Sequence, residues 1–307
     1  MTKILITGGM GFIFSHVTEY FIKKGFEVHV VDNLSAGSHP ELIPEFKKLG
    51  PGRFFFHEYD ASFAQMVPII TTMNPEYIIH AAAISDVDYS IKQPTKTILS
   101  NNNATMHIFE GARQCKNLRK LLYVSTDEVY GECEHPKREE EIIFPKNPYS
   151  LSKAFGSILR LAFDNTYREL RDKTVETRFC NVFGPRQDDR KVIPAIKRAM
   201  NGGSPLVVHN EGTGYRQFIH VSEIPPIMDT LLERGNRTYN VTTGEGYTVN
   251  ELIQMAQEIT GKQVVCITGK RAGMDARYEM SCDRLRDEFS WKPTRTFKES
   301  FEEYLKS

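Results

Sequence analysis

Residues 3–14 read Lys-Ile-Leu-Ile-Thr-Gly-Gly-Met-Gly-Phe-Ile-Phe, and this stretch decides the fold. Lys3 to Thr7 has the composition of a short buried strand, and Gly8 to Gly11 that of a tight turn. Phe12 to Lys24 then carries apolar residues at helical spacing. Glu27 to Val31 is the next apolar run. The sequence therefore predicts a strand, a glycine-rich turn, a helix and a second strand parallel to the first.

The glycine-rich turn is typical of dinucleotide-binding sites. Gly8 and Gly11 permit a tight turn, and the N-terminus of the next helix meets the pyrophosphate. An acidic residue is expected about twenty positions on, where it binds the adenosine ribose hydroxyls, and Asp32 occupies that place. Its carboxylate would repel a 2′-phosphate, so we expect NAD rather than NADP. Phe14 stands where a third small residue lets the helix pack on the strand, so we expect the helix to tilt or the ring to fill a gap.

The same alternation continues beyond this unit. Further strands are predicted at 77–80 and 120–125, and helices at 98–115 and 149–171. We therefore expect an α/β fold with a Rossmann-type doubly wound parallel sheet and a smaller C-terminal substrate-binding lobe.

The pattern becomes irregular and richer in glycine after residue 182. A helix is predicted at 250–260, followed by a polar tail to Ser307. We expect an NAD-binding Rossmann domain at 1–182 and a mainly substrate-binding lobe at 183–307, with returns of the chain to the sheet near 215–242.

The composition argues against several classes of protein. The 307 residues carry 39 basic and 39 acidic side chains, and no basic run interleaved with aromatic residues indicates nucleic-acid binding. The five cysteines lack ligand spacing, so we expect neither a metal site nor a disulfide framework. The first apolar run is too short for a signal peptide, and no stretch is long enough to span a membrane. We expect a cytoplasmic protein with no nucleic-acid or membrane partner.

Two further motifs carry acid–base groups. Tyr149 and Lys153 are four residues apart on a predicted helix and share one face, where the ammonium would lower the pKa of the phenol. Asp127 and Glu128 supply a second pair, which oxidation of an alcohol does not need and elimination of water does. Alternate side chains of a strand point apart, so this pair can serve one substrate only from the loop beyond the strand end.

These motifs together resemble the extended short-chain dehydrogenase/reductase family of nucleotide-sugar enzymes. The resemblance rests on the glycine-rich turn, on His80-Ala81-Ala82-Ala83, on Ser125-Thr126-Asp127-Glu128-Val129-Tyr130-Gly131 and on Tyr149-x-x-x-Lys153. The Thr-Asp-Glu triplet is most similar to the dTDP-glucose 4,6-dehydratase group.

The resemblance implies a reaction with named roles. Tyr149 would take the O4 proton of the sugar while C4 passes its hydride to NAD, Lys153 would lower the tyrosine pKa and hold the nicotinamide ribose, and Thr126 would hydrogen-bond the O4 region. Glu128 would remove the C5 proton and Asp127 would protonate the departing C6 hydroxyl. Hydride would return to C6, giving a 4-keto-6-deoxy sugar and regenerating NAD.

The resemblance also implies binding residues and an assembly. The residues implied for NAD are Gly8, Gly11, Phe12, Ile13, Asp32, Asn33, Asp60, Ala61, Ala81, Ala82, Asn101, Tyr149 and Lys153. Those implied for the substrate are Ser85, Asn181, Arg216, Asn240 and Arg277, among which the arginine forks suit a diphosphate. The helices at 98–115 and 149–171 resemble those that pair in a homodimer.

Alternatives are open at this point. Residues 85–90 and Gln217-Phe218 depart from the pattern usual in dTDP-glucose enzymes, so a UDP-sugar or an N-acetylated hexose is an alternative substrate. A nucleotide-sugar 4-epimerase would use Tyr149, Lys153 and NAD without the elimination pair. A UDP-uronic acid decarboxylase would more typically have Ser in place of Asp127. A non-catalytic protein that binds NAD or a nucleotide sugar is a further alternative, because the third position of the glycine motif is altered.

Overall fold

The computed structural model describes residues 1–35, 37–270 and 276–307. Within these residues the main sheet has seven strands, all parallel, in the order β10-β6-β5-β4-β1-β2-β3. The strands are β1 (Lys3–Thr7), β2 (Glu27–Asp32), β3 (Phe54–Glu58), β4 (Tyr77–His80), β5 (Lys120–Thr126), β6 (Thr174–Phe179) and β10 (Thr238–Val241). The predicted α/β fold with a doubly wound parallel sheet is confirmed.

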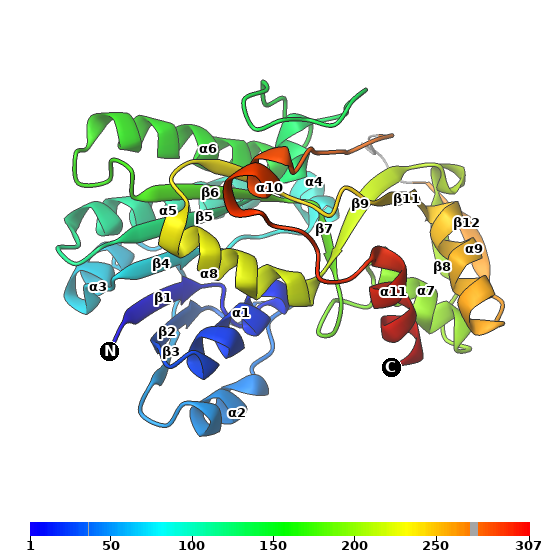
Figure 1. Ribbon diagram of the computed structural model, residues 1–307, viewed down its shortest axis with the longest axis horizontal. Coiled ribbons are helices and arrows are strands. Elements are labelled where there is room, and N and C mark those ends of the chain that lie inside the picture. Colours follow the sequence, from blue (N-terminus) through cyan, green and yellow to red (C-terminus); the bar gives the residue numbers. More distant parts are fainter. Residues whose placement is uncertain (36, 271–275) are drawn as a thin grey trace.

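Helices lie on both faces of this sheet (Figure 1). One face is covered by α3 (Met66–Met73), α5 (Pro94–Gln114) and α6 (Pro148–Thr166), with the short α4 (Val87–Lys92) beside them. The other face is covered by α1 (Phe12–Lys23), α2 (Leu42–Leu49) and α8 (Ile224–Arg234). Among the described residues, none of these or the remaining helices combines the length and hydropathy required to cross a bilayer.

The two faces follow from the period of two along each strand. In β1, Leu5 packs with α3 and α5, whereas Ile4 and Ile6 pack with α1 and α8. In β2, Val31 shares the face of Leu5. Each strand therefore contributes apolar side chains to two cores, as a sheet buried on both faces requires.

A smaller lobe lies beside the carboxyl ends of the strands (Figure 1). Its two small sheets are β11-β9-β7 and β12-β8. Its strands and helices are β7 (Asn181–Phe183), α7 (Val192–Met200), β8 (Leu206–His209), β9 (Tyr215–His220), β11 (Gly246–Thr248), α9 (Val249–Thr260), β12 (Cys266–Gly269) and α11 (Phe297–Lys306). A separate apolar core that includes Phe183, Phe218 and Phe301 holds the lobe together.

Short elements complete the chain. They are the 3-10 turns η1 (Asp127–Tyr130), η2 (Asn210–Gly212) and η3 (Val221–Glu223), and the helix α10 (Asp283–Phe289). Between the lobe strands β9 and β11 the chain returns to the main sheet through α8 and β10, where β10 pairs with β6.

Two expectations about helices were wrong. The helix predicted to reach residue 171 ends at Thr166, because Tyr167 adopts an extended conformation and Leu170 turns inward to become fully buried. The polar tail contains α10 and α11, and α11 buries Phe297, Phe301 and Leu305 along one face. Spacing of four places these three side chains together on the helix.

Candidate active site

The predicted site residues lie just beyond the carboxyl ends of the strands of the main sheet. The glycine-rich turn follows β1, Asp32 ends β2, Ala81 follows β4 and Asp127 follows β5. The carboxyl ends of parallel strands meet at the same edge, and β1 lies where the strand order reverses. Ligands of open α/β sheets bind at such a position.

The glycine-rich turn leaves no room for side chains. Gly8 has a φ of 71°, and a Cβ there would lie 2.8 Å from the backbone N and Cα of Ala82. Gly11 forms the N-cap of α1, which has no side-chain cap and no acidic residue in its first turn. The first-turn N–H groups and the helix dipole therefore suit a pyrophosphate. Phe12 and Ile13, the first two residues of the helix, pack partly buried against the core.

Asp32 is almost fully buried below this turn, at 6% exposure. One carboxylate oxygen accepts a hydrogen bond of 3.0 Å from the Met10 N–H. The other accepts bonds of 2.9 Å from the Leu34 N–H and from the Ser38 hydroxyl. A carboxylate has about four acceptor positions, so one remains for a ribose hydroxyl. The turn and Asp32 together fit a dinucleotide.

Phe14 is packed inside the protein. Its side chain is 6% exposed and belongs to the apolar core shared with Val17 and Phe21 of the same helix. Of the two expectations for this position, the structure shows a ring that fills space in the core. The glycine turn ahead of it keeps the close approach between Gly8 and Ala82.

The neighbouring loops are fixed by short polar contacts. Asn33 Nδ2 donates to Asp60 at 2.9 Å, and Ser62 N donates to the other Asp60 oxygen at 2.8 Å. Although partial burial raises it, these hydrogen bonds bring the pKa of Asp60 below its ordinary value. Ala61 beside it is buried. Thr7 Oγ1 accepts from the Ala82 N–H at 3.2 Å, which holds the segment after β4 against the end of β1.

Asn101 connects this segment to α6. Its Oδ1 accepts from the Ile84 N–H at 2.8 Å, and its Nδ2 donates to the Ile84 carbonyl at 3.1 Å and to Ser152 Oγ at 2.9 Å. Ser152 in turn donates to the Tyr149 carbonyl at 2.7 Å. Asn101, predicted as a cofactor residue, therefore holds the loop after β4 and the helix that carries Tyr149 in one arrangement.

Asp127 is a buried carboxyl at the start of η1, with 5% of its surface exposed. Thr126 Oγ1 donates to its Oδ1 at 3.1 Å, whereas its Oδ2 is buried and has no hydrogen-bond partner in the part of the chain that the structure describes. Burial and the nearby charge of Glu128 raise the pKa of Asp127 to about 7. This carboxyl can therefore hold or release a proton near neutral pH.

Glu128 follows in a different environment. It is partly exposed, and its carboxylate accepts a hydrogen bond of 2.9 Å from Asn147 Nδ2. The turn η1 lies beyond the end of β5, so Asp127 and Glu128 occupy the position expected for a pair that serves one substrate. Asn147 was not predicted as a site residue, although the Asn-Pro pair before Tyr149 is a typical start of a helix.

Tyr149 and Lys153 lie on α6, and both are buried. Burial raises the pKa of Tyr149, and the charges of Glu128 and Asp127 raise it further. This direction is opposite to the lowering expected from Lys153. Lys153 Nζ donates to the Val124 carbonyl at 2.8 Å and lies 5.4 Å from the centre of the Tyr123 ring. Burial lowers the pKa of Lys153 to about 8.

The predicted substrate residues lie in three kinds of surroundings. Ser85 and Asn181 are exposed at the strand-end edge. Arg216 lies over the Tyr278 ring at 4.3 Å, and Arg277 lies over the Tyr215 ring at 4.2 Å. Asp127 senses the charge of Arg216, which acts to lower its pKa.

Asn240 belongs instead to a buried polar network. It is fully buried, its Oδ1 accepts from the Tyr130 hydroxyl at 2.9 Å, and its Nδ2 donates to the Lys137 carbonyl at 2.9 Å. Arg178 donates to the same tyrosine hydroxyl at 2.7 Å and to Glu176 at 2.8 Å. Both ends of the Asn240 amide are therefore hydrogen-bonded within the protein.

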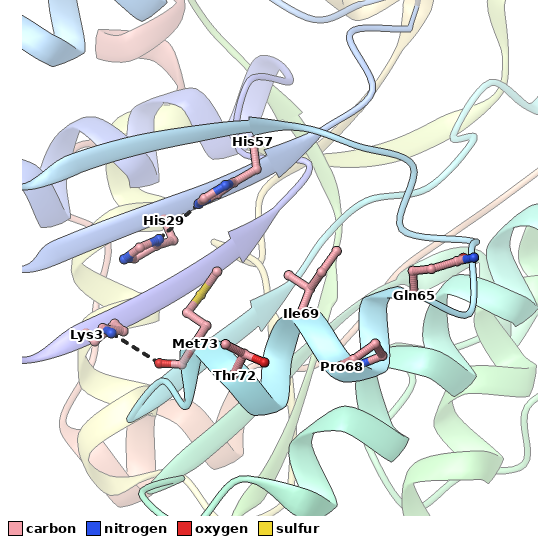
Figure 2. A pocket seen from close by; sticks show the side chains of 8 residues that line it. All are labelled: Lys3, His29, His57, Gln65, Pro68, Ile69, Thr72 and Met73. Carbon is pink, nitrogen blue, oxygen red and sulfur yellow. Dashed lines mark hydrogen bonds between the residues drawn. The ribbon is translucent and has the colours of Figure 1, made fainter.

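A separate groove of about 490 Å³ lies between α3 and the face of β1, β2 and β3 (Figure 2). His29 Nδ1 and His57 Nε2 are 3.0 Å apart there, and His29 Nε2 lies 2.9 Å from Glu27. Across residues 1–35, 37–270 and 276–307, no three His, Cys, Asp or Glu side chains are grouped to hold a metal ion. The groove lies on the sheet face and does not share lining residues with the glycine-rich turn.

Comparison with known proteins places this geometry in a family. Residues 5–304 match the GDP-mannose 4,6 dehydratase family. A low-salt glycan biosynthesis protein, Agl12, of Haloferax volcanii is 32% identical, with 97% of this chain and 96% of the relative covered. The dTDP-glucose 4,6-dehydratase of Salmonella typhimurium is 28% identical, with 96% and 89% covered.

Solved structures agree in fold. The dTDP-glucose 4,6-dehydratase DesIV of Streptomyces venezuelae, solved with NAD bound, has a TM-score of 0.90 at 25% identity and covers 99% of this chain and 96% of its own. The UDP-glucose 4-epimerase of Thermus thermophilus, also solved with NAD, has a TM-score of 0.88 at 27% identity, with 99% and 98% covered. The resemblance predicted from the motifs is confirmed, and the chain belongs to the GDP-mannose 4,6 dehydratase family of extended short-chain dehydrogenases.

Proposed function

We propose that this protein is an NAD-dependent nucleotide-sugar 4,6-dehydratase. The observation that carries the proposal is the buried carboxyl of Asp127, whose pKa is about 7 and whose Oδ2 has no hydrogen-bond partner among the described residues. Elimination of water needs an acid that can give a proton to a departing hydroxyl near neutral pH. Asp127 has this property and lies beside Glu128 and Tyr149.

Tyr149 acts in the oxidation of C4. Its phenolate accepts the proton of the O4 hydroxyl, and the Thr126 hydroxyl would hydrogen-bond the O4 region after giving up its bond to Asp127 Oδ1. Lys153 is buried on the next turn of α6, where its ammonium would hold the nicotinamide ribose. Two carboxylates next to Tyr149 oppose loss of its proton, so the tyrosine becomes a base only when charge in the filled site compensates them.

Glu128 and Asp127 act in the elimination. The 4-ketone makes the C5 proton acidic, and Glu128 removes it. Asp127 gives its proton to the C6 hydroxyl, whose bond to carbon breaks, so that one water leaves. The two carboxyls have different roles because their surroundings differ: Asp127 is buried, whereas Glu128 is partly exposed and hydrogen-bonded to Asn147.

The glycine-rich turn, Asp32 and Lys153 would hold NAD. When bound, NAD accepts hydride from C4 and returns it to C6, so that the cofactor is unchanged over one turnover. The chain contributes the anion site at the N-terminus of α1 and the carboxylate of Asp32 for the adenosine ribose. Asn101 keeps the loop after β4 in contact with α6 on the other side of the site.

Arg216 and Arg277 support a diphosphate substrate. Each guanidinium lies over a tyrosine ring, and its planar fork can form bidentate bonds with phosphate oxygens once a substrate replaces its contacts within the protein. In this structure Arg277 Nε donates a hydrogen bond of 2.9 Å to the Glu279 carboxylate. The relatives named for their substrates act on dTDP-glucose or UDP-glucose, and we propose a nucleotide hexose with a free C6 hydroxyl.

Mass analysis of the product tests the function. The protein is incubated with dTDP-glucose, UDP-glucose, GDP-mannose and UDP-N-acetylglucosamine in turn. A dehydratase gives a product lighter by one water. A product of unchanged mass with an inverted C4 indicates a 4-epimerase, which is the activity of UDP-glucose 4-epimerases solved with the same fold. If the protein forms no product from any of these sugars, the proposal is overturned.

We also propose that the protein is a homodimer through α5 and α6. These adjacent helices expose large apolar side chains on one side, namely Leu99 and Met106 of α5 and Leu151, Ile158 and Leu161 of α6. Spacings of seven and three residues keep each set on one helix face, and a second copy would bury both. Light scattering should give a dimer mass for the protein and a monomer mass for Ile158→Lys. A monomeric unmodified protein would refute the dimer.

A further inference from the structure

Asn147 contacts both halves of the site. Its Oδ1 accepts the Ser150 N–H at 2.8 Å and its backbone N–H donates to Ser150 Oγ at 3.1 Å, which caps α6 ahead of Tyr149. Its Nδ2 donates to Glu128 Oε2 at 2.9 Å. One side chain therefore joins the turn after β5 to the helix that carries the tyrosine.

The orientation of the Asn147 amide is fixed by its partners. A backbone N–H can only donate, so the amide atom facing Ser150 must be the oxygen. The NH₂ group must then face the carboxylate, which can only accept while it is ionised. Glu128 thus receives a donor that does not titrate and cannot take its proton.

We propose that Asn147 is a positioning residue for Glu128 and acts through it in proton removal from C5. This inference rests on the proposed function. Glu128 lies on a short turn and is partly exposed, so a hydrogen bond from a fixed donor restricts the orientation of its carboxylate. The Asn147 amide holds one carboxylate oxygen of Glu128 on the side of α6, where Tyr149 also lies.

The inference predicts a separation between two steps. Oxidation of C4 depends on Tyr149, and Tyr149 keeps its position as long as α6 is capped. Proton removal from C5 depends on the orientation of Glu128. A change that keeps the cap and removes the Nδ2 donor should therefore slow the second step alone.

Asn147→Asp makes this change. The carboxylate keeps an acceptor for the Ser150 N–H, because Asp is as good an N-cap as Asn, and places a negative oxygen against Glu128. Ser150→Ala is the matched control, since it removes the reciprocal half of the capping box and leaves the Asn147–Glu128 bond. Asn147→Ala removes both contacts.

The experiment uses the nucleotide sugar that the unmodified protein dehydrates. Single turnovers in deuterated water give the rate of NADH formation and, normalised to it, the rate of C5 exchange. We expect Asn147→Asp and Asn147→Ala to lower C5 exchange by about tenfold or more, the scale of one hydrogen bond to a charged group. The added carboxylate of Asn147→Asp should move NADH formation to higher pH, and the normalised C5 exchange corrects for this. Both rates of Ser150→Ala should stay close to those of the unmodified protein.

Two results would overturn the inference. In one, Asn147→Asp keeps the normal rate of C5 exchange. In the other, Asn147→Asp and Ser150→Ala both lose NADH formation and C5 exchange in the same proportion, which is the pattern of a purely structural cap. Failure of the proposed function is distinct, since the unmodified protein would then release no water from any nucleotide sugar.

Discussion

Asp127 and Glu128 are consecutive in the chain, yet only Asp127 is buried, and Glu128 is partly exposed beside Asn147. Each raises the pKa of Tyr149 in the neighbouring helix. Three ionisable groups with different surroundings are therefore coupled at the end of β5. This coupling allows the separate steps of a dehydratase to be tested by single substitutions.

Asp127→Asn should stabilise the protein above neutral pH. The pKa of Asp127 in the folded state is about 7, above its ordinary value of 3.8, so the folded state favours the protonated form. The stability that this preference gives is complete below the unfolded pKa and is lost as pH rises to about 7. At pH 8 the ionised carboxyl costs up to roughly 4 kcal/mol, and Asn removes that cost.

Urea unfolding at pH 5 and pH 8 measures this effect. The gain from Asp127→Asn should be clearly larger at pH 8 than at pH 5, because pH 5 lies only a little above the ordinary pKa of 3.8 and a smaller part of the cost is present there. An equal change at both pH values would mean that Asp127 is already ionised at pH 5 in the folded protein. The same variant should release water more slowly, by about 10²–10⁴-fold, if Asp127 is the general acid.

Removing the carboxylates beside Tyr149 should make the tyrosine a base at lower pH. The charges of Glu128 and Asp127 raise its pKa, so Glu128→Gln should lower it. In single turnovers, the rise of NADH formation with pH should shift to lower pH in Glu128→Gln, and Tyr149→Phe should form no NADH at any pH. An unchanged profile in Glu128→Gln would show that this carboxylate does not act on the tyrosine.

The preference for NAD over NADP should depend on Asp32. Calorimetry should give tighter binding of NAD than of NADP. Asp32→Ala should bring the two affinities closer together, chiefly by lowering the affinity for NAD. The same variant should melt at a lower temperature, because the N–H groups of Met10 and Leu34 lose their acceptor. Equal binding of both cofactors by the unmodified protein would contradict this role.

Phe14 should be needed for stability. The ring is 6% exposed in the core below α1, so Phe14→Ala should cost about 3–5 kcal/mol of unfolding free energy, the range for deletion of a buried Phe. Chemical denaturation checks the loss. A variant of unchanged stability that binds NAD more tightly would instead mean that the ring only hinders the cofactor.

The histidine pair in the groove should make the protein sensitive to acid. Burial lowers the pKa of His29 and of His57 below the ordinary value of 6.5, and each protonated ring would repel the other. Their contribution to stability is therefore present above pH 6.5 and is lost as pH falls below it. His57→Gln should unfold at a urea midpoint that changes less between pH 7 and pH 5. A slope equal to that of the unmodified protein would exclude the pair as the cause.

The sequence predicted the parts of the fold that depend on local pattern. The strand at Lys3–Thr7, the glycine turn and the strand beginning at Glu27 are confirmed because buried parallel strands are continuous apolar runs. The terminal helix α11 was missed, although Thr296 and Glu299 form a capping box ahead of it. The capping box indicates a helix, but the polar composition of the segment led to the prediction of a tail without one.

Tertiary features explain the remaining differences. Tyr167 ends α6 because Leu170 turns into the core, which no local propensity specifies. The raised pKa of Tyr149 depends on burial and on two carboxylates from another element. The contact between Asn147 and Glu128 depends on the fold bringing the turn after β5 against the start of α6, which the local sequence does not specify. The roles of the predicted catalytic residues stay predictions that the substitutions above test.

The measurement that tests the central claim most directly is the isotope content of the product made in deuterated water. The unmodified protein is incubated with dTDP-glucose, UDP-glucose and GDP-mannose, and each product is examined by mass spectrometry and proton NMR. We predict a 6-deoxy-4-keto nucleotide sugar that has lost one water and carries deuterium at C5, while Glu128→Gln incorporates none. A product that keeps its oxygen at C6, made equally well by Glu128→Gln, would contradict the dehydratase account and favour a 4-epimerase.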